Sequence, residues 1–179
     1  TLRGEQSPTL LSLLDTCSTN MGSRLMQFWL HRPLRDARAI QNRLDCVTAL
    51  LGDSASNYYV PTRIILRKFV DIERIAARIA LQSARPRDLS GLRDSLKLIP
   101  ELNEILTPCH SEALQPLIQI FQIDAAWVNC LNESLLEEPA TVLREGNVIA
   151  DGYDAELDEL RALQNNCGEF LLQLEIREK

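Results

Sequence analysis

Apolar residues recur at intervals of three and four along most of the chain, the spacing that gathers them on one face of an α-helix. The cleanest stretch follows Asp71, where Ile72, Ile75 and Ile79 alternate with charged residues. The pattern therefore predicts an all-α protein, an irregular helical bundle. Helix starts are expected at Pro8, Thr19, Asp36, Pro61, Asp71, Pro86 and Asp154, with two further helices over about 111–122 and 124–136.

Helix ends are marked as clearly as the starts. Pro33 should stop the second helix, because the residue before a proline is pushed out of the helical region. Gly52 should end the third by supplying a left-handed residue. Pro100 must kink or divide the helix that opens at Pro86. Trp29 and Trp127 both fall on apolar helical faces, so we expect each to pack in the core.

Residues 141–150 depart from the helical spacing. Two runs rich in β-branched residues, Thr141-Val142-Leu143-Arg144 and Val148-Ile149-Ala150, flank Glu145-Gly146-Asn147. Such runs around a glycine turn are typical of a hairpin. We therefore predict one small β-hairpin at about 141–150, lying against the helices, within a helical core domain of residues 1–153. Residues 154–179 should begin a long separate helix.

The net charge of −6 divides unevenly between the two parts of the chain. Residues 1–100 hold 15 Lys+Arg against 9 Asp+Glu, whereas residues 101–179 hold 4 against 16. One part could face an anion while the other could not, although solvated helix faces are the simpler interpretation. Five cysteines without a closely spaced pair indicate a reducing, intracellular compartment.

The arginines that follow Asp71 form the clearest basic cluster. Arg74, Arg78 and Arg85 project in nearly the same direction from one helix. The simplest interpretation is a solvated face with pairs such as Asp71–Arg74, each contributing a few tenths of a kcal/mol. The functional alternative is contact with phosphates or with an acidic neighbouring domain.

Motifs for catalysis and for cofactors are missing from the sequence. No lysine follows a glycine, so there is no phosphate-cradling P-loop. His31 and His110 lie far apart and away from any cysteine pair, so the sequence lacks the residue sets needed for a zinc site or for Cys-His catalysis. We expect no enzyme, no bound metal and no cofactor in this chain.

Three stretches, taken together, resemble the MutS family of DNA mismatch-repair proteins. The first runs from Ser12 through Asn20-Met21-Gly22-Ser23-Arg24-Leu25 to Arg32-Pro33-Leu34, and resembles the opening of the family's core or lever domain. The second runs from Asp71-Ile72-Glu73-Arg74 to Asp88-Leu89, and the third from Gly146 to Asp158. Their order and spacing agree along essentially the whole chain. Asn20 departs from the pattern, since many relatives place a proline there.

The resemblance implies a role that the residues alone do not show. Family members are dimers that embrace DNA, with a Phe-x-Glu mismatch reader at one end and a P-loop ATPase, which uses ATP and Mg, at the other. Neither motif occurs here. What remains would be the lever, a non-catalytic helical connection that couples the state of the ATPase to the DNA clamp. Its partners would be the connector, clamp and ATPase domains, mismatched DNA and a second subunit, in a bacterial cytoplasm at the nucleoid.

The chain begins at Thr1 without a charged-then-apolar leader and has no apolar run long enough to span a membrane, so we expect part of a longer protein. In the family, the last helix packs against segments that return from the clamp. We therefore predict that its apolar face seeks a partner, through a helix–helix dimer or by fraying toward Lys179. That face comprises Leu157, Leu160, Leu163, Phe170, Leu171 and Leu174.

Two other functions are compatible with the same residues. A helical protein-interaction adaptor could use an exposed apolar helix face for its partner. An enzyme whose site is assembled from scattered carboxylates ranks last, because the acidic residues Glu156, Asp158 and Glu159 are explained by the dipole at a helix start.

Overall fold

The computed structural model describes residues 9–52 and 57–178, apart from the side chains at 165–167, 169–175 and 178. Over this part of the chain the fold is all-α, as the apolar spacing predicts. The helices are α1 (Leu10–Leu14), α2 (Asn20–His31), α3 (Ala37–Leu51), α4 (Tyr59–Leu66), α5 (Ile72–Ala80), α6 (Pro86–Lys97), α7 (Ile99–Leu106), α8 (Gln115–Ile120), α9 (Ala125–Ser134) and α10 (Ala155–Glu178), with one 3-10 turn at Leu143–Glu145.

Thr19, Asp36 and Asp154 cap helices where the sequence places them, whereas α4 begins at Tyr59, two residues before the expected start at Pro61. The expected start at Pro8 lies outside the described residues, and Thr9 caps α1. The Thr19 hydroxyl accepts the Gly22 N–H at 3.0 Å, and Asp36 accepts the Arg38 N–H at 2.9 Å. At the start of α10, Asp154 Oδ1 accepts the Leu157 N–H at 3.0 Å. Gly52, with φ 63°, ends α3. Helix starts and stops are local chemistry, and the local sequence determines them.

Pro100 divides the helix that opens at Pro86. Helix α6 ends at Lys97 and α7 begins at Ile99, so the proline occupies the first turn of α7. A proline there loses no helical hydrogen bond, because the first N–H groups of a helix have no partner within it.

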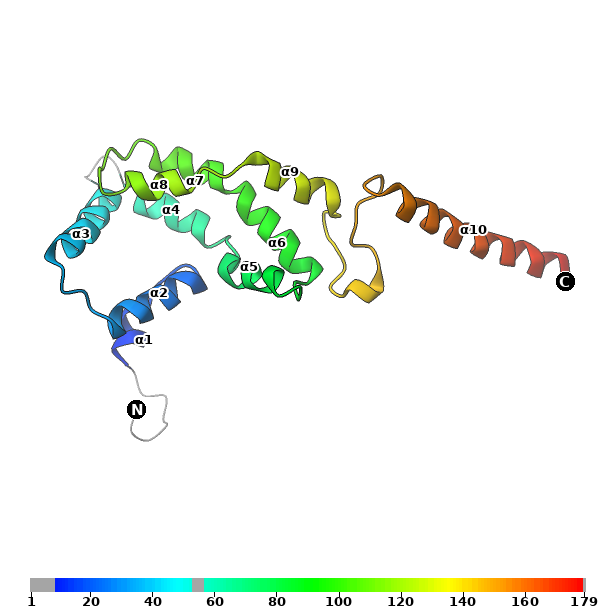
Figure 1. Cartoon of the computed structure of the whole chain (residues 1–179), viewed down its shortest axis with the longest axis horizontal. Helices are drawn as coiled ribbons and strands as arrows, with labels where there is room; N and C mark the ends of the chain where they lie inside the picture. The colour runs from blue at the N-terminus through cyan, green and yellow to red at the C-terminus, as the bar shows by residue number, and fades with distance from the viewer. Residues whose placement is uncertain (1–8, 53–56, 179) are drawn as a thin grey trace, which may run out of the picture.

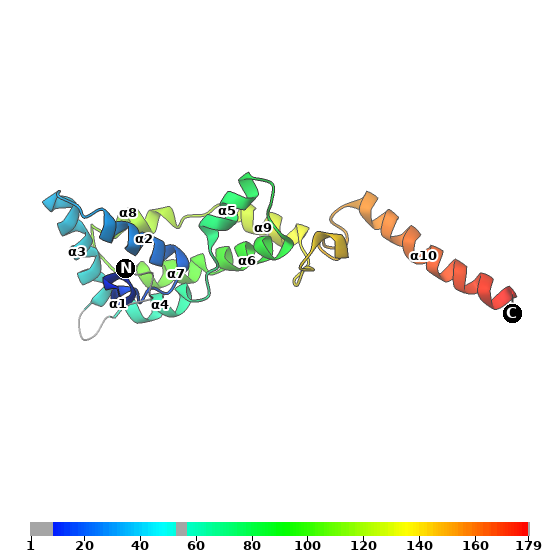
Figure 2. The same cartoon turned by 90° about the horizontal axis from the view of Figure 1, so that it is seen from below.

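The core lies between α4 and α7. Ile65 of α4 packs with Leu102 and Leu106 of α7, and all three are almost fully buried. Partly buried side chains surround this centre: Leu50, Leu66, Phe69, Leu98, Ile105, Ile118 and Phe121. Figure 1 shows the resulting elongated body, with α2 and α3 at one end and α10 projecting from the other. The same arrangement is seen from below in Figure 2.

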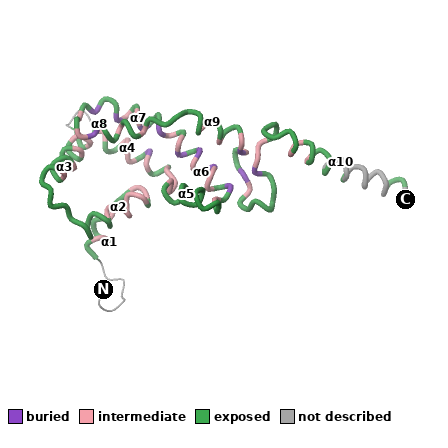
Figure 3. The backbone as a smooth tube through the Cα atoms, in the orientation of Figure 1, coloured by how far each residue is buried: buried purple, intermediate pink, exposed green. Residues whose placement is uncertain are grey.

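This shape leaves much apolar surface uncovered. The chain exposes 13978 Å², whereas a compact monomer of 20.2 kDa would expose about 8,800 Å². Figure 3 shows buried positions along the middle of the body and in the segment before α10, whereas α2, α3 and the described part of α10 are exposed or intermediate. The end helices therefore keep their apolar residues in contact with water.

Both tryptophans contradict the prediction that they pack in the core. Trp29 is 38% exposed and Trp127 is 67% exposed. Helix α3 behaves similarly, since its regular stripe of Ile40, Leu44, Val47 and Leu51 is between 40% and 53% exposed. Periodicity identifies the apolar face of a helix, but it does not identify a neighbour to cover that face.

The predicted β-hairpin at 141–150 is also wrong. Its first arm turns into the 3-10 helix at 143–145, and Ile149 forms an isolated antiparallel bridge with Leu135, at the end of α9. The Leu136 N–H donates to the Val148 carbonyl and the Ala150 N–H to the Ser134 carbonyl, both at 3.0 Å.

Burial explains this choice of partner. Leu135 and Val148 are buried when the two segments pair. Val142 and Leu143, in contrast, are exposed. Pairing of residues 148–150 with this exposed first arm would bury less apolar surface than pairing with Leu135 does. The turn at Gly146 is nevertheless present, with φ 69° and ψ −156°.

Gly146 should tolerate no side chain without a local penalty. Its backbone angles fall in a region nearly restricted to glycine, so Gly146→Ala should destabilise the 135–149 pairing by about 1 to 2 kcal/mol. Faster amide exchange at Leu136 and Ala150 would measure this loss. Gly168→Ala is the matched control, because Gly168 lies inside α10 in open space and alanine there favours helix by up to about 1 kcal/mol. Equal exchange in both variants would contradict the assignment.

Candidate functional site

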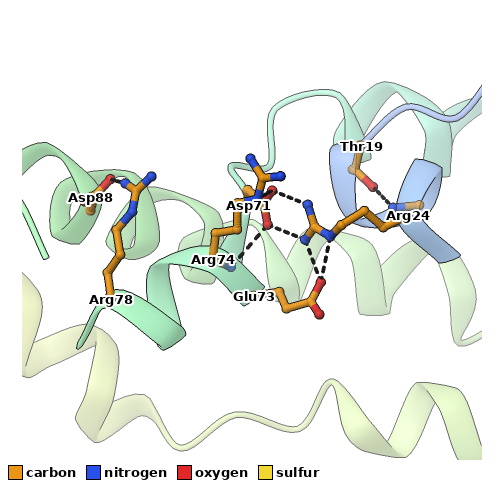
Figure 4. A network of polar contacts seen from close by, with 8 residues as sticks. Thr19, Arg24, Asp71, Glu73, Arg74, Arg78 and Asp88 are labelled. Carbon is orange, nitrogen blue, oxygen red and sulfur yellow. Dashed lines mark hydrogen bonds and ion pairs between the residues drawn. The ribbon is translucent and has the colours of Figure 1, made fainter. Parts of the chain in front are cut away.

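Arg24 joins two helices that are far apart in the sequence. From α2 its guanidinium reaches Asp71 with two hydrogen bonds, Nη1 to Oδ2 at 2.6 Å and Nη2 to Oδ1 at 2.7 Å. Nη2 also reaches Glu73 Oε2 at 2.5 Å. Figure 4 shows this fork between α2 and the start of α5. The paired geometry is the strong form of an arginine–carboxylate contact, since two parallel bonds fix both distance and direction.

The electrostatics of the pair follow from this geometry. The Arg24 guanidinium lowers the pKa of Asp71 from 3.8 to about 2, against the opposing effect of burial, and the Arg74 N–H lowers it further. Reciprocally, Asp71 and then Glu73 raise the pKa of Arg24. Asp71 has a second task, because it accepts the Arg74 N–H at 3.2 Å and so caps α5. One carboxylate thus fixes the start of α5 and its position relative to α2.

A second arginine holds the same end of the molecule. Arg63 of α4 donates from Nη2 to the Thr16 carbonyl, in the loop between α1 and α2, at 2.9 Å. None of the residues in α1 or α2 is buried. The α1–α2 unit is therefore attached to the body mainly by directional polar contacts made by Arg24 and Arg63.

The predicted phosphate-contact residues lie beside this network. Arg74 is largely exposed and lies 3.6 Å from Asp71, while Arg78 pairs with Asp88 at 2.6 Å (Figure 4). Arg85 does not share a helix with Arg74 and Arg78, as the sequence predicted, because α5 ends at Ala80 and Arg85 is the N-cap residue of α6. Its side chain is exposed, and its backbone N–H donates to Asp88 Oδ2 at 3.0 Å. The pairs expected on a solvated face are thus present. Contact of these arginines with phosphates or an acidic domain stays a prediction.

Two further arginines connect the body to α10. Arg93 of α6 is buried and donates to two carbonyls just beyond α9, that of Leu136 at 3.0 Å and that of Glu137 at 2.8 Å. Leu135 then pairs with Ile149 through the antiparallel bridge. Because a buried guanidinium needs acceptors for its N–H groups, the carbonyls at 136 and 137 are held in place by Arg93.

Arg161 closes the connection from the α10 side. Its Nη2 donates to the Ile149 carbonyl at 2.9 Å, and its Nη1 reaches Asp151 at 2.7 Å and Asp158 at 3.3 Å. The Gly152 N–H donates to Asp158 Oδ2 at 2.7 Å. We call residues 149–154 together with Arg161 the elbow. Its contacts fix the direction in which α10 leaves the body.

The predicted apolar partner face lies along α10. Leu160 is 57% and Leu163 is 60% exposed, and Leu157 is half-buried. The side chains of Phe170, Leu171 and Leu174 lie outside the described residues, although the backbone there is helical. Two of the three described leucines of this face are therefore exposed, and binding of a partner by this face stays a prediction.

The sequence pattern did not assign roles to Arg24, Arg93 and Arg161. Arg24 stands in the first motif stretch, but nothing local links it to Asp71, 47 positions later. Arg93 lies seven positions after the buried Pro86 on the inward side of α6, and a charged residue at such a position signals a buried polar contact. Arg161 had no signal beyond its position in the acidic first turns of α10.

Two further features concern the described parts of the chain, a possible metal site and a possible membrane span. No group of three or more His, Cys, Asp or Glu side chains comes together there to hold a metal ion. Nor is any helix in these residues both long and apolar enough to cross a bilayer.

One comparison with known proteins bears on these contacts. The family model described as MutS domain III matches residues 1–176. The match includes α2 and α5, which Arg24 joins, and the elbow.

The Asp71 pair makes stability depend on pH in a defined window. Because the folded-state pKa of Asp71 is depressed, its stabilisation is present above pH 3.8 and is lost as the pH falls toward 2. Asp71→Asn should remove this dependence. At pH 7 the variant should lower the free energy of unfolding by about 1 to 2 kcal/mol, as for a partly buried charged hydrogen bond. Urea unfolding of the wild type and the variant across pH 2 to 7 measures both the pH dependence and the change in the free energy of unfolding.

Matched variants separate the ion pair from the helix cap. Asparagine caps a helix about as well as aspartate, so Asp71→Ala should cost about 1 kcal/mol more than Asp71→Asn. Glu73→Gln should have little effect, because that side chain is 70% exposed. A wild-type pH profile in Asp71→Asn would rule out the pair as its source.

Proposed function

The chain belongs to the MutS domain III family of mismatch-repair proteins, and on this premise we propose that it is the lever that couples an ATPase to a DNA clamp. A lever needs an arm, a rigid base and a joint between them. The described residues supply candidates for all three.

The observation that carries the proposal is the placement of α10. This single helix of 24 residues projects from the end of the body (Figure 1), and its length is about 36 Å. Its described contacts with the rest of the chain gather at its first turns, through Arg161 and Asp158. A helix held at its base transmits rotation of that base over its whole length.

The base of the arm is connected to the body by a series of polar contacts. Arg93 fixes the carbonyls at 136 and 137, the bridge joins Leu135 to Ile149, and Arg161 fixes the Ile149 carbonyl. Each contact is directional, so a shift of α6 would be passed on to α10 as a change of angle. Small shifts of packed helices are an established way of amplifying a local change into a domain movement.

The remaining partners belong to the same proposal. The arm would meet the clamp and the body would meet the connector and ATPase domains, with mismatched DNA and a second subunit bound by the complete protein. ATP and Mg would bind outside this segment. We place the complete protein in the bacterial cytoplasm, at the nucleoid.

The exposed apolar faces favour one alternative, a helical adaptor that binds a protein partner. Leu44 and Val47 of α3 are 53% exposed, which is typical of surfaces that another polypeptide covers. The two functions differ in what happens at the elbow, because an adaptor does not need a fixed angle between α10 and the body.

Arg161→Met should loosen the arm without unfolding the body. Removal of the guanidinium frees the Ile149 carbonyl and Asp151 while keeping the apolar stem. Spin labels at positions 97 and 164, in a background with alanine at the five cysteines, should show a broader distance distribution. In the complete protein, ATP-driven release of mismatched DNA should slow by about tenfold, while ATP hydrolysis persists, as for a coupling energy of about 1.4 kcal/mol.

The matched control is Arg177→Met, on the same helix but near its far end and exposed. It should leave both the distance distribution and the release rate unchanged. If Arg161→Met broadens the distances but release stays normal, the elbow is structural and the lever function is refuted.

The chain by itself should not bind ATP, because it has no phosphate-cradling loop. It should also bind mismatched and paired DNA equally weakly, with strong salt dependence from arginine–phosphate contacts. Calorimetry with ATP and anisotropy with the two DNA duplexes test these expectations. Saturable micromolar nucleotide binding, or a preference for the mismatch, would place a reading or ATPase function in this segment.

A further inference from the structure

Helix α6 is held by buried polar side chains on both of its sides. It packs against both α5 and α9 (Figure 1). Three of its four buried residues are polar, namely Ser90, Arg93 and Ser95. Because a buried polar group is costly unless it is hydrogen-bonded, the partners of these side chains show which segments α6 holds in place.

Ser95 and Gly91 together hold Val70, the residue that precedes Asp71. Ser95 is 0% exposed, and its Oγ accepts the Val70 N–H at 3.1 Å. One turn earlier in α6, a Cβ placed on Gly91 would lie 3.0 Å from Val70 Cγ1, so the backbone of α6 touches this side chain directly. The residue that leads into α5 is thus fixed to α6 both by a hydrogen bond and by packing.

Arg93 leaves α6 on the opposite side. It is two positions from both Gly91 and Ser95, a rotation of about 200° around the helix axis. From there it donates to the carbonyls of Leu136 and Glu137. Helix α6 therefore contacts the start of α5 with one side and the segment that leads to the elbow with the other.

The contacts on the two sides of α6 join into one series from α2 to α10. Arg24 of α2 holds Asp71, which is next to Val70. On the other side, Arg93 holds the segment that pairs with the elbow. Coupling between distant sites passes through such contiguous contacts when each is stiff. We infer that Ser95 is a positioning residue that couples α2 to α10: by holding α6 to Val70, it makes the direction of α10 depend on the Arg24–Asp71 pair.

The stiffness of the link follows from its burial. If α6 and Val70 moved apart, the Val70 N–H and the Ser95 hydroxyl would both lose their partner inside the protein, which costs more than the loss of an exposed hydrogen bond. A shift of α2 that moves Asp71 is therefore passed to α6 and is not absorbed at this contact. The inference rests on the proposed lever function and adds the place from which the arm is controlled.

Amide hydrogen exchange on the full chain tests the coupling. Arg24→Met removes the pair with Asp71, so exchange should accelerate at the Arg74 amide, which Asp71 caps. It should also accelerate about fivefold at the amides of Leu136 and Ala150, which join the two segments before the elbow.

Ser95→Ala should break the transmission. In this background, Arg24→Met should still accelerate exchange at Arg74 but should cause no further change at Leu136 and Ala150. A side chain that only stabilises the fold would not remove the response of one site to a change at another, so this double-mutant comparison isolates the positioning role.

Two further variants of α6 serve as controls. Ser90→Ala is matched to Ser95→Ala, because Ser90 is also buried but its hydroxyl donates to the Arg87 carbonyl of the same helix, at 3.3 Å. It should leave the fivefold response intact. Gly91→Ala tests the same contact in case Ser95→Ala lowers the helix content. Its methyl group should displace Val70 and accelerate exchange at Leu136 and Ala150 with Arg24 present, although alanine favours the helix itself.

Three results would overturn the inference. Unchanged exchange at Leu136 and Ala150 in Arg24→Met shows that the two ends are not coupled. A fivefold response that persists in Ser95→Ala shows that coupling bypasses this side chain. Equal acceleration at the Leu102 amide, in the core, shows only a loss of global stability. The lever function is judged separately, by the release of mismatched DNA from the complete protein, so either can fail without the other.

Discussion

Four arginines hold the ends of this molecule where apolar burial does not reach. The core around Ile65, Leu102 and Leu106 fixes α4 and α7 and their nearest neighbours. Helix α2 buries no residue, so its position depends on Arg24 and Arg63. The described part of α10 is uncovered beyond its first turns, so its position depends on Arg93 and Arg161. A guanidinium fixes direction through several N–H donors while covering little area. The molecule is therefore elongated, because single arginine side chains, and not packed layers of apolar residues, join the end helices to the core.

The parts that the sequence predicted correctly are those decided within a few residues. Thr19, Asp36 and Asp154 cap helices because each side chain accepts an N–H two or three positions later. Gly52 and Pro100 divide helices through their own backbone restrictions. Such effects need no knowledge of the fold, so the helical class and most boundaries follow from the printed sequence.

The parts that could not be predicted depend on what lies across from a residue. Helix α3 has apolar residues on two sides, and nothing in the spacing tells that Leu50 faces the core while Leu44 faces water. The strand-like run at 148–150 was evident, but its partner near Leu135 was determined by burial. The same limit applies to the site, because Arg74, Arg78 and Arg85 share a local spacing, whereas Arg24 gains its role from Asp71.

The elbow holds the base of α10 by polar contacts, and such contacts suit the joint of the proposed lever. Over an arm of about 36 Å, a rotation of 10° at the base moves the tip by about 6 Å. Apolar packing preserves the buried area but allows small rotations between the packed helices. Arg161, in contrast, must keep hydrogen bonds to the Ile149 carbonyl and to Asp151 at the same time, which restricts the angle between α10 and the body. The Arg161 hydrogen bonds can also be broken together and replaced, since water or another acceptor can take the place of each oxygen. For the proposed lever, such a joint combines one firmly held angle with a means of switching to another.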